Sequence, residues 1–159
     1  ELIGISPQEA AEGLKRTELT GKRLKISEKN GFKVIDDTYN ACEDSVISAL
    51  DTLAATEGKR KVAILGDIIG LAERAEPDHK NVGAYAAKKG VDLLIAVGDD
   101  ARYYAQGASG LMEEENIRYF PKKEDFIRIK DSLLREGDVI LVKASRGMEM
   151  EKIVNEIIR

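Results

Sequence analysis

Short apolar segments alternate with longer amphipathic ones along most of this chain. Four segments are apolar almost throughout, as is typical of strands covered by helices on both faces. These segments are residues 61–66, 92–98, 117–120 and 138–143. Apolar residues recur at a helical period around residues 46–54, 126–134 and 153–158. The order of strands and helices predicts an α/β fold, with a mostly parallel sheet between two layers of helices.

The first part of the chain follows a different pattern. Ser6, Pro7 and Glu9 are typical of a capped helix start, and we expect this helix to run to about Arg16. A stretch rich in Thr and Gly follows at 17–21. In the next segment, RLKISEKNGFKVI, apolar residues alternate with polar ones before an Asn-Gly pair that is typical of a turn. This segment predicts a β-hairpin and therefore one antiparallel strand at the edge of the sheet.

Length and charge narrow the class of protein. A chain of 159 residues suits one compact domain with a short appendage. The net charge of −4 gives no basic field for nucleic acid, and no apolar run is long enough to cross a bilayer. The single cysteine excludes an internal disulfide, so a cytoplasmic protein is expected. Because the chain begins at Glu1, we expect a piece of a longer protein or a trimmed one.

Polar and charged residues follow four of the predicted strands. They lie at residues 36–40, 66–67, 98–100 and 143–147. In open α/β sheets, ligands bind at the carboxyl ends of the strands. These four segments are therefore the candidate site.

The usual phosphate-binding motifs of this fold class are absent. The sequence contains neither G-x-x-x-x-G-K-[ST] nor G-x-G-x-x-G. One cysteine and one histidine cannot form a zinc site, and nothing supports a Cys42–His79 nucleophile pair. We interpret Cys42 as structural and His79 as a polar residue at a helix start. The chain therefore offers part of a site rather than a complete one.

Four motifs resemble the Mur ligase family, in its MurF type. DDTYNACEDS (36–45) is similar to the family's D-D-S-Y-N-A-N-P-x-S, and residues 49–68 resemble a helix and a strand that ends in L-G-D-M. His79 and Gly83 fit H-x-x-x-G, and residues 137–151 resemble G-D-x-V-L-V-K-G-S-R-x-M-x-M-E. The motifs keep the family's order over roughly residues 20–158.

The resemblance implies the C-terminal domain of a three-domain enzyme, a Rossmann-like three-layer sandwich. Residues 1–20 would be a junction helix and linker from a missing central domain, and residues 21–159 the C-terminal domain. The MurF type joins D-alanyl-D-alanine to UDP-N-acetylmuramoyl tripeptide in peptidoglycan synthesis, through an acyl phosphate made with ATP and Mg²⁺, and the resemblance implies this reaction here. The partners implied are these two substrates and the N-terminal and central domains. The phosphate loop would lie in the central domain, so we expect the isolated chain to be folded but inactive.

The resemblance also implies roles for individual residues. Asp37 would accept hydrogen bonds from the ribose hydroxyls of ATP, and Arg23 would reach ATP from the domain junction. The remaining implied ligands face the substrates, and they are Tyr39, Asn40, Lys143, Ser145 and Arg146. No metal ligand is implied in this domain.

Several positions depart from the family pattern. Cys42 and Glu43 replace Asn-Pro, which removes a helix cap worth about 0.5–2 kcal/mol. Ala144 replaces a glycine, a change that a backbone with positive φ would resist. Gly70 and Ala72 stand where the family tends to have Glu and Gly. The dipeptide preference, and the roles of Asp67 and His79, stay open.

Three other interpretations remain at this point. Asp36, Asp37, Asp99 and Lys143 mimic the acidic residues and lysine of a phosphoacceptor receiver domain, which binds Mg²⁺. Against it, 62 residues separate Asp37 from Asp99, and that spacing is too long for the receiver fold. Another member of the Mur ligase family, or a binding domain without catalysis, is also possible because fold alone does not imply function.

Overall fold

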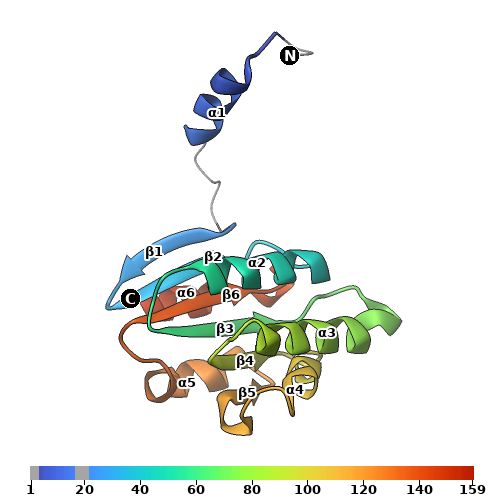
Figure 1. Cartoon of the computed structure of the whole chain (residues 1–159). Helices are drawn as coiled ribbons and strands as arrows, with labels where there is room; N and C mark the ends of the chain where they lie inside the picture. Colours follow the sequence, from blue (N-terminus) through green and yellow to red (C-terminus); the bar gives the residue numbers. More distant parts are fainter. Residues whose placement is uncertain (1–3, 17–21) are drawn as a thin grey trace.

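A computed structural model describes residues 4–16 and 22–159 of the chain. One six-stranded sheet forms the centre of the molecule, in the order β1-β2-β6-β3-β4-β5 (Figure 1). All neighbouring strands are parallel except β1 and β2, which confirms the predicted fold class. The strands are β1 (Lys25–Lys29), β2 (Phe32–Asp37), β3 (Arg60–Gly66), β4 (Leu93–Val97), β5 (Ile117–Phe120) and β6 (Asp138–Lys143).

Helices cover both faces of the sheet and bury two apolar clusters. The helices of the described residues are α1 (Pro7–Lys15), α2 (Glu43–Ala55), α3 (Ala75–Lys88), α4 (Arg102–Ala108), α5 (Lys123–Leu133) and α6 (Glu151–Ile158). On one face, α2, α3 and α4 pack on side chains such as Leu65 and Leu141. On the other, α5 and α6 pack on Ile64 and Ile140. Successive residues of a strand point to opposite faces, so each buried strand supplies both clusters.

The hairpin forms where the sequence predicts it. Lys29 and Phe32 are paired across the two-residue turn. Asn30 and Gly31 have φ values of 54° and 79°, the left-handed geometry that a type I′ turn requires. This turn fixes the register that makes β1 the antiparallel edge strand.

The capped start of α1 is also confirmed. The Ser6 N–H donates to Glu9 Oε2 at 2.8 Å, and the Glu9 N–H donates to Ser6 Oγ at 3.2 Å. This reciprocal pair satisfies two backbone donors that the first turn leaves free. In Figure 1, α1 stands apart from the sheet. The predicted boundary at residues 17–21 lies outside the described residues.

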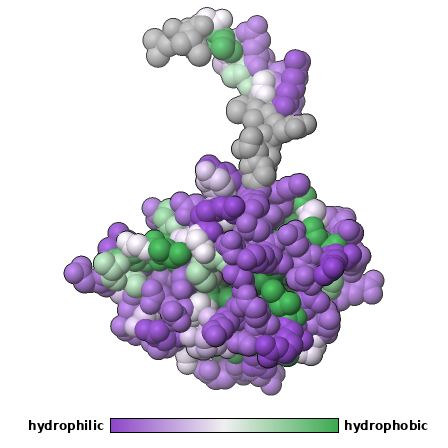
Figure 2. Space-filling model, turned by 180° about the vertical axis from the view of Figure 1, so that it is seen from behind, coloured by the Kyte–Doolittle hydropathy of each residue, from purple (hydrophilic) through white to green (hydrophobic). Residues whose placement is uncertain are grey.

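Figure 2 shows one face of the molecule, coloured by the hydropathy of each residue. That face is mostly hydrophilic, with hydrophobic atoms in small separate areas. Over residues 4–16 and 22–159, none of the helices has the length and apolar composition that crossing a bilayer demands.

Candidate functional site

The carboxyl ends of β2 and β6 border a hollow of about 440 Å³. Five of the seven predicted ligands line it, and they are Arg23, Asp37, Tyr39, Asn40 and Lys143. These five residues therefore meet at the edge of the sheet where α/β folds bind ligands, which makes the hollow the candidate site.

A buried ion pair forms the floor of this hollow. Lys143 Nζ lies 2.6 Å from Asp37 Oδ2, and the two residues are only 2% and 8% exposed. Lys143 also donates to the Asn40 backbone carbonyl at 2.8 Å, and Asp37 Oδ1 accepts the Leu24 N–H at 3.1 Å. Two of the three ammonium donors are thus used inside the domain. Lys143 holds Asp37 and Asn40 in place, while each Asp37 oxygen keeps a lone pair for a ligand.

Arg23 and Tyr39 form the outer wall. The Arg23 guanidinium carbon lies 4.1 Å from the centre of the Tyr39 ring, a cation–π contact. The Tyr39 N–H donates to the Lys22 carbonyl at 3.0 Å. Lys22 and Leu24 both have positive φ, 45° and 46°, which turns this segment back onto the end of β2. Both side chains of the wall are exposed and free to meet a ligand.

Helix α2 begins beside the hollow, at the two residues that replace the family's Asn-Pro, Cys42 and Glu43. Cys42 is the N-cap residue, and Ser45 Oγ accepts its N–H at 3.0 Å. Ser45 therefore supplies half of a capping box, and Glu43 and Asp44 add favourable charge to the first turn. These contacts offset part of the expected loss of the asparagine cap.

Ser145 and Arg146 lie outside the lining of the hollow. Ser145 is 5% exposed, and its Oγ accepts the Ile69 N–H at 2.9 Å. Its own N–H donates to the Asp67 carbonyl at 3.0 Å. Arg146 is exposed and pairs with Glu151. The seven predicted ligands thus form two groups: five line the hollow, and Ser145 and Arg146 lie in the loop after β6.

Two of the other sequence departures have a structural explanation. Ala144 does not have positive φ, so its methyl group causes no backbone strain. It packs instead on Gly66, where an added Cβ would lie 2.7 Å from the Ala144 Cβ. Ala72 does have positive φ, 50°, which explains why the family tends to have glycine there.

Asp67 and His79 support the loops around the site. Asp67 accepts the N–H groups of Asp99 at 3.0 Å and Ala101 at 2.7 Å, so it fixes the turn that leads into α4. Burial raises the pKa of Asp67, although these two hydrogen bonds oppose the change. His79 lies near the start of α3 as expected, but its side chain is fully buried rather than solvated. This burial could not be predicted from the sequence, because the residues around His79 are mostly polar.

The receiver interpretation requires a metal site that these residues do not form. Asp37 is paired with Lys143, and Asp99 contacts Asp67 through its backbone. In the part of the chain that the structure describes, no three acidic, histidine or cysteine residues lie close enough to hold a metal ion. Asp37 ends β2 and Asp99 follows β4, and strands β6 and β3 lie between these two strands in the sheet.

Glu151 links the segment before β1 to the loop after β6. Its Oε1 lies 2.6 Å from Lys22 Nζ and 2.8 Å from Arg146 Nη1. Burial raises the pKa of Glu151, but hydrogen bonds from Lys22, its own backbone and Arg146 outweigh burial and lower the pKa to about 2. The carboxylate stays ionised in the folded protein and binds two cations from different loops.

We expect Glu151→Gln to weaken the dependence of the free energy of unfolding on pH in the acid range. A carboxylate whose pKa is lowered on folding contributes stability above its unfolded pKa of about 4.5, and that contribution is lost as pH falls towards 2. Urea unfolding at about pH 6, 4 and 2.5 should show the wild type more stable at pH 6 and the difference shrinking steadily down to pH 2.5. A difference that is constant across pH would contradict this role for the charge. Glu156→Gln, at an exposed pair with Arg159, is the matched control.

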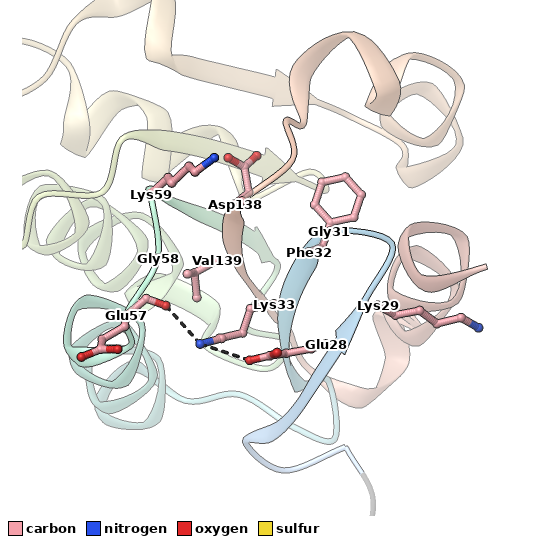
Figure 3. Close-up of a pocket in the computed structure, with 11 residues that line it drawn as sticks. Glu28, Lys29, Gly31, Phe32, Lys33, Glu57, Gly58, Lys59, Asp138 and Val139 are labelled. Atoms are coloured by element: carbon pink, nitrogen blue, oxygen red, sulfur yellow. Dashed lines mark hydrogen bonds and ion pairs between the residues drawn. The ribbon is translucent and has the colours of Figure 1, made fainter.

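A second hollow, of about 510 Å³, lies at the opposite edge of the sheet (Figure 3). Lys33 points across it and donates to the Glu57 carbonyl at 3.2 Å, with Glu28 also 3.2 Å away. Asp138, on another wall, is held by two hydrogen bonds from Arg60 at 2.9 and 2.7 Å. None of the predicted ligands lines this hollow, and it lies at the amino ends of β2 and β6.

The family of the chain follows from comparison with known proteins. The family described as "Mur ligase, glutamate ligase domain" matches residues 16–146, and the chain belongs to it. A relative from Bacillus subtilis (strain 168), named UDP-N-acetylmuramoyl-tripeptide--D-alanyl-D-alanine ligase, is 34% identical over 158 residues. The match covers 98% of this chain and 35% of that relative. The ligase of the same name from Escherichia coli (strain K12) is 34% identical over 139 residues, covering 86% of this chain and 29% of the relative.

Solved structures agree with this family. The crystal structure of MurF from Acinetobacter baumannii superposes with a TM-score of 0.86 at 26% identity, covering 98% of this chain and 34% of that one. MurF from Thermotoga maritima, solved in complex with ADP, shares the fold with a TM-score of 0.73 at 23% identity, covering 89% of this chain and 31% of that one. The chain spans about a third of the length of the curated relatives named above.

Proposed function

We propose that this chain is the C-terminal domain of a cytoplasmic, ATP-dependent amide ligase that adds D-alanyl-D-alanine to UDP-N-acetylmuramoyl tripeptide. The observation that carries the proposal is the convergence of Arg23, Asp37, Tyr39 and Asn40 on one hollow at the carboxyl edge. The 34% identity to ligases of this name supports the choice of substrates.

In this proposal, the residues in and beside the hollow have separate roles. Asp37 accepts hydrogen bonds from the ATP ribose, and Arg23 approaches the nucleotide from the junction. Tyr39 and Asn40 face the peptide substrates. Lys143 acts through Asp37 and Asn40, because its ammonium is directed at them. Ser145 and Arg146 meet an anionic group of the tripeptide substrate.

The proposed domain organisation assigns the remaining parts of the reaction elsewhere. Residues 1–20 are a junction, residues 21–159 are the C-terminal domain, and the N-terminal and central domains precede them. Mg²⁺ and the ATP phosphates bind mainly to the central domain, where the family carries its phosphate loop. The C-terminal domain closes over an acyl phosphate that water would otherwise hydrolyse.

Phosphate release from ATP tests the proposal in a ligase that contains this chain. Release should require both UDP-N-acetylmuramoyl tripeptide and D-alanyl-D-alanine. Arg23→Gln, at an exposed side chain, should raise the KM for ATP by about tenfold without loss of stability. Asp37→Asn should raise the same constant, with its folding checked separately because Asp37 is buried.

Release that does not depend on D-alanyl-D-alanine would overturn the choice of ligase. An unchanged KM for ATP in folded Asp37→Asn and Arg23→Gln would overturn the nucleotide assignment. The isolated 159-residue chain should release no phosphate under the same conditions, and turnover by it would contradict the proposed division of the site.

A further inference from the structure

The loops that follow β3 and β6 are tied together by two hydrogen bonds. The Ile69 N–H donates to Ser145 Oγ at 2.9 Å, and the Ser145 N–H donates to the Asp67 carbonyl at 3.0 Å. Ser145 is nearly buried and Arg146 follows it directly. The position of the loop after β6 therefore depends on where the Ile68–Ile69 backbone is held.

The side chain of His79 binds the backbone of Ile68. Its Nδ1 lies 2.6 Å from the Ala75 carbonyl, which can only accept, so Nδ1 carries the proton. The other nitrogen, Nε2, is then a lone-pair acceptor, and it receives the Ile68 N–H at 3.1 Å. The ring is fully buried and stacks at a tilt on Tyr104, with 4.6 Å between ring centres. Both nitrogens and one face of the ring are therefore fixed.

Tyr104 closes the same arrangement from α4. Its hydroxyl donates to the Gly66 carbonyl at 3.1 Å, at the end of β3. Burial, with the nearby charges of Asp67 and Asp100, keeps the pKa of Tyr104 well above its usual value, so the hydroxyl remains a donor. The end of β3 thus has contacts to α3 through His79 and to α4 through Tyr104.

We propose that His79 is a positioning residue for the proposed ligase reaction: it fixes the Ile68–Ile69 backbone and thereby places Ser145 and Arg146 for the anionic substrate. This inference rests on the proposed function for the role of Ser145 and Arg146. His79 lies behind the loop and does not itself contact substrate. If Nε2 is removed, the Ile68 N–H loses its acceptor, and the peptide must rotate to find another. That rotation moves the Ile69 N–H away from Ser145.

Replacing His79 with glutamine or asparagine tests the roles of the two ring nitrogens separately. The terminal amide of glutamine reaches the position of Nε2 and can accept the Ile68 N–H, whereas that of asparagine reaches only the position of Nδ1. His79→Gln should preserve the loop, and His79→Asn should release it. Val82→Ala is the stability control, because Val82 is fully buried in α3 and belongs to the adjoining core without bonding to either loop.

The first measurement is amide hydrogen exchange by NMR on the 159-residue chain. In His79→Asn, exchange at Ile69 and Ser145 should rise by about tenfold more than it does in Val82→Ala. Glutamine should restore slow exchange at both amides. Equal exchange in His79→Asn and Val82→Ala would overturn the link between His79 and the loop.

The second measurement separates this inference from the proposed function. In a ligase containing the chain, Ser145→Ala and His79→Asn should each raise the KM for UDP-N-acetylmuramoyl tripeptide by about tenfold, with kcat changed by less than about twofold. His79→Gln and Val82→Ala should leave KM near the wild-type value. If Ser145→Ala raises KM and His79→Asn does not, the positioning role is wrong. If neither does, the proposed substrate role of the Ser145–Arg146 loop is wrong, and with it the positioning role.

Discussion

Replacing Lys143 with methionine should lower the free energy of unfolding by about 3–5 kcal/mol, because it leaves the buried Asp37 carboxylate without its partner. The two residues are adjacent in the parallel ladder between β2 and β6, and their charged atoms are 2.6 Å apart. Asp37 would retain only the Leu24 N–H among its charge-stabilising contacts in the described residues. Methionine keeps the length and apolar bulk of lysine, so loss of the charge dominates. Urea unfolding of the 159-residue chain measures the change.

A second substitution shows whether the charge is the cause. Asp37→Asn combined with Lys143→Met removes both charges and should recover most of the lost stability. Lys88→Met, at an exposed lysine near the end of α3, should change the free energy of unfolding by no more than about 0.5 kcal/mol. A Lys143→Met variant as stable as the wild type would contradict the structural role of the pair.

In the proposed ligase the ion pair would also matter for function, because the same contacts position two proposed ligands. Lys143 binds the Asp37 side chain and the Asn40 backbone, one on each side of the turn after β2. In the proposed ligase, the double variant would therefore be folded but poor in nucleotide binding. The double variant would thus keep its stability but lose nucleotide binding, as expected where polar groups are buried in order to position ligands.

The sequence was sufficient to predict the features that depend on neighbouring residues. Asn30 and Gly31 adopt left-handed conformations that few other residues tolerate, so the hairpin could be predicted locally. The buried strands could be predicted because an apolar run without alternation suits a sheet covered on both faces. The residues after the strands could also be predicted as a candidate site, since strand ends in this fold class share one edge.

The features that depend on tertiary contacts could not be predicted in the same way. The pairing of Lys143 with Asp37 follows from the register of β2 against β6, which no local pattern specifies. Neither α3 nor α4 was predicted from periodicity, because their contact is made by small residues and backbone rather than a stripe of large apolar side chains. In α5, the helical period predicts Ile129 on the apolar face, but this residue is 42% exposed.

The contact between α3 and α4 depends on two glycines, one in each helix. A Cβ added at Gly83 would lie 2.0 Å from the Tyr104 carbonyl oxygen and 2.8 Å from its Cα. A Cβ added at Gly107 would lie 2.0 Å from the Lys80 carbonyl oxygen. The obstructing atoms belong to backbone, which cannot rotate away as a side chain can. The two helices can cross this closely only without side chains at these positions.

Gly83→Ala should therefore destabilise the protein by about 3 kcal/mol or more, at or above the upper end of overpacking costs. Helix propensity alone predicts the opposite, a gain of about 1 kcal/mol, so the sign of the change decides which effect dominates. Gln106→Ala, at an exposed residue of α4, is the control and should change stability by no more than about 0.5 kcal/mol. The close crossing also brings Tyr104 to His79 and to the end of β3. Urea unfolding in which Gly83→Ala is as stable as the wild type would show that the helices can separate without cost, and that Tyr104 is not held by their contact.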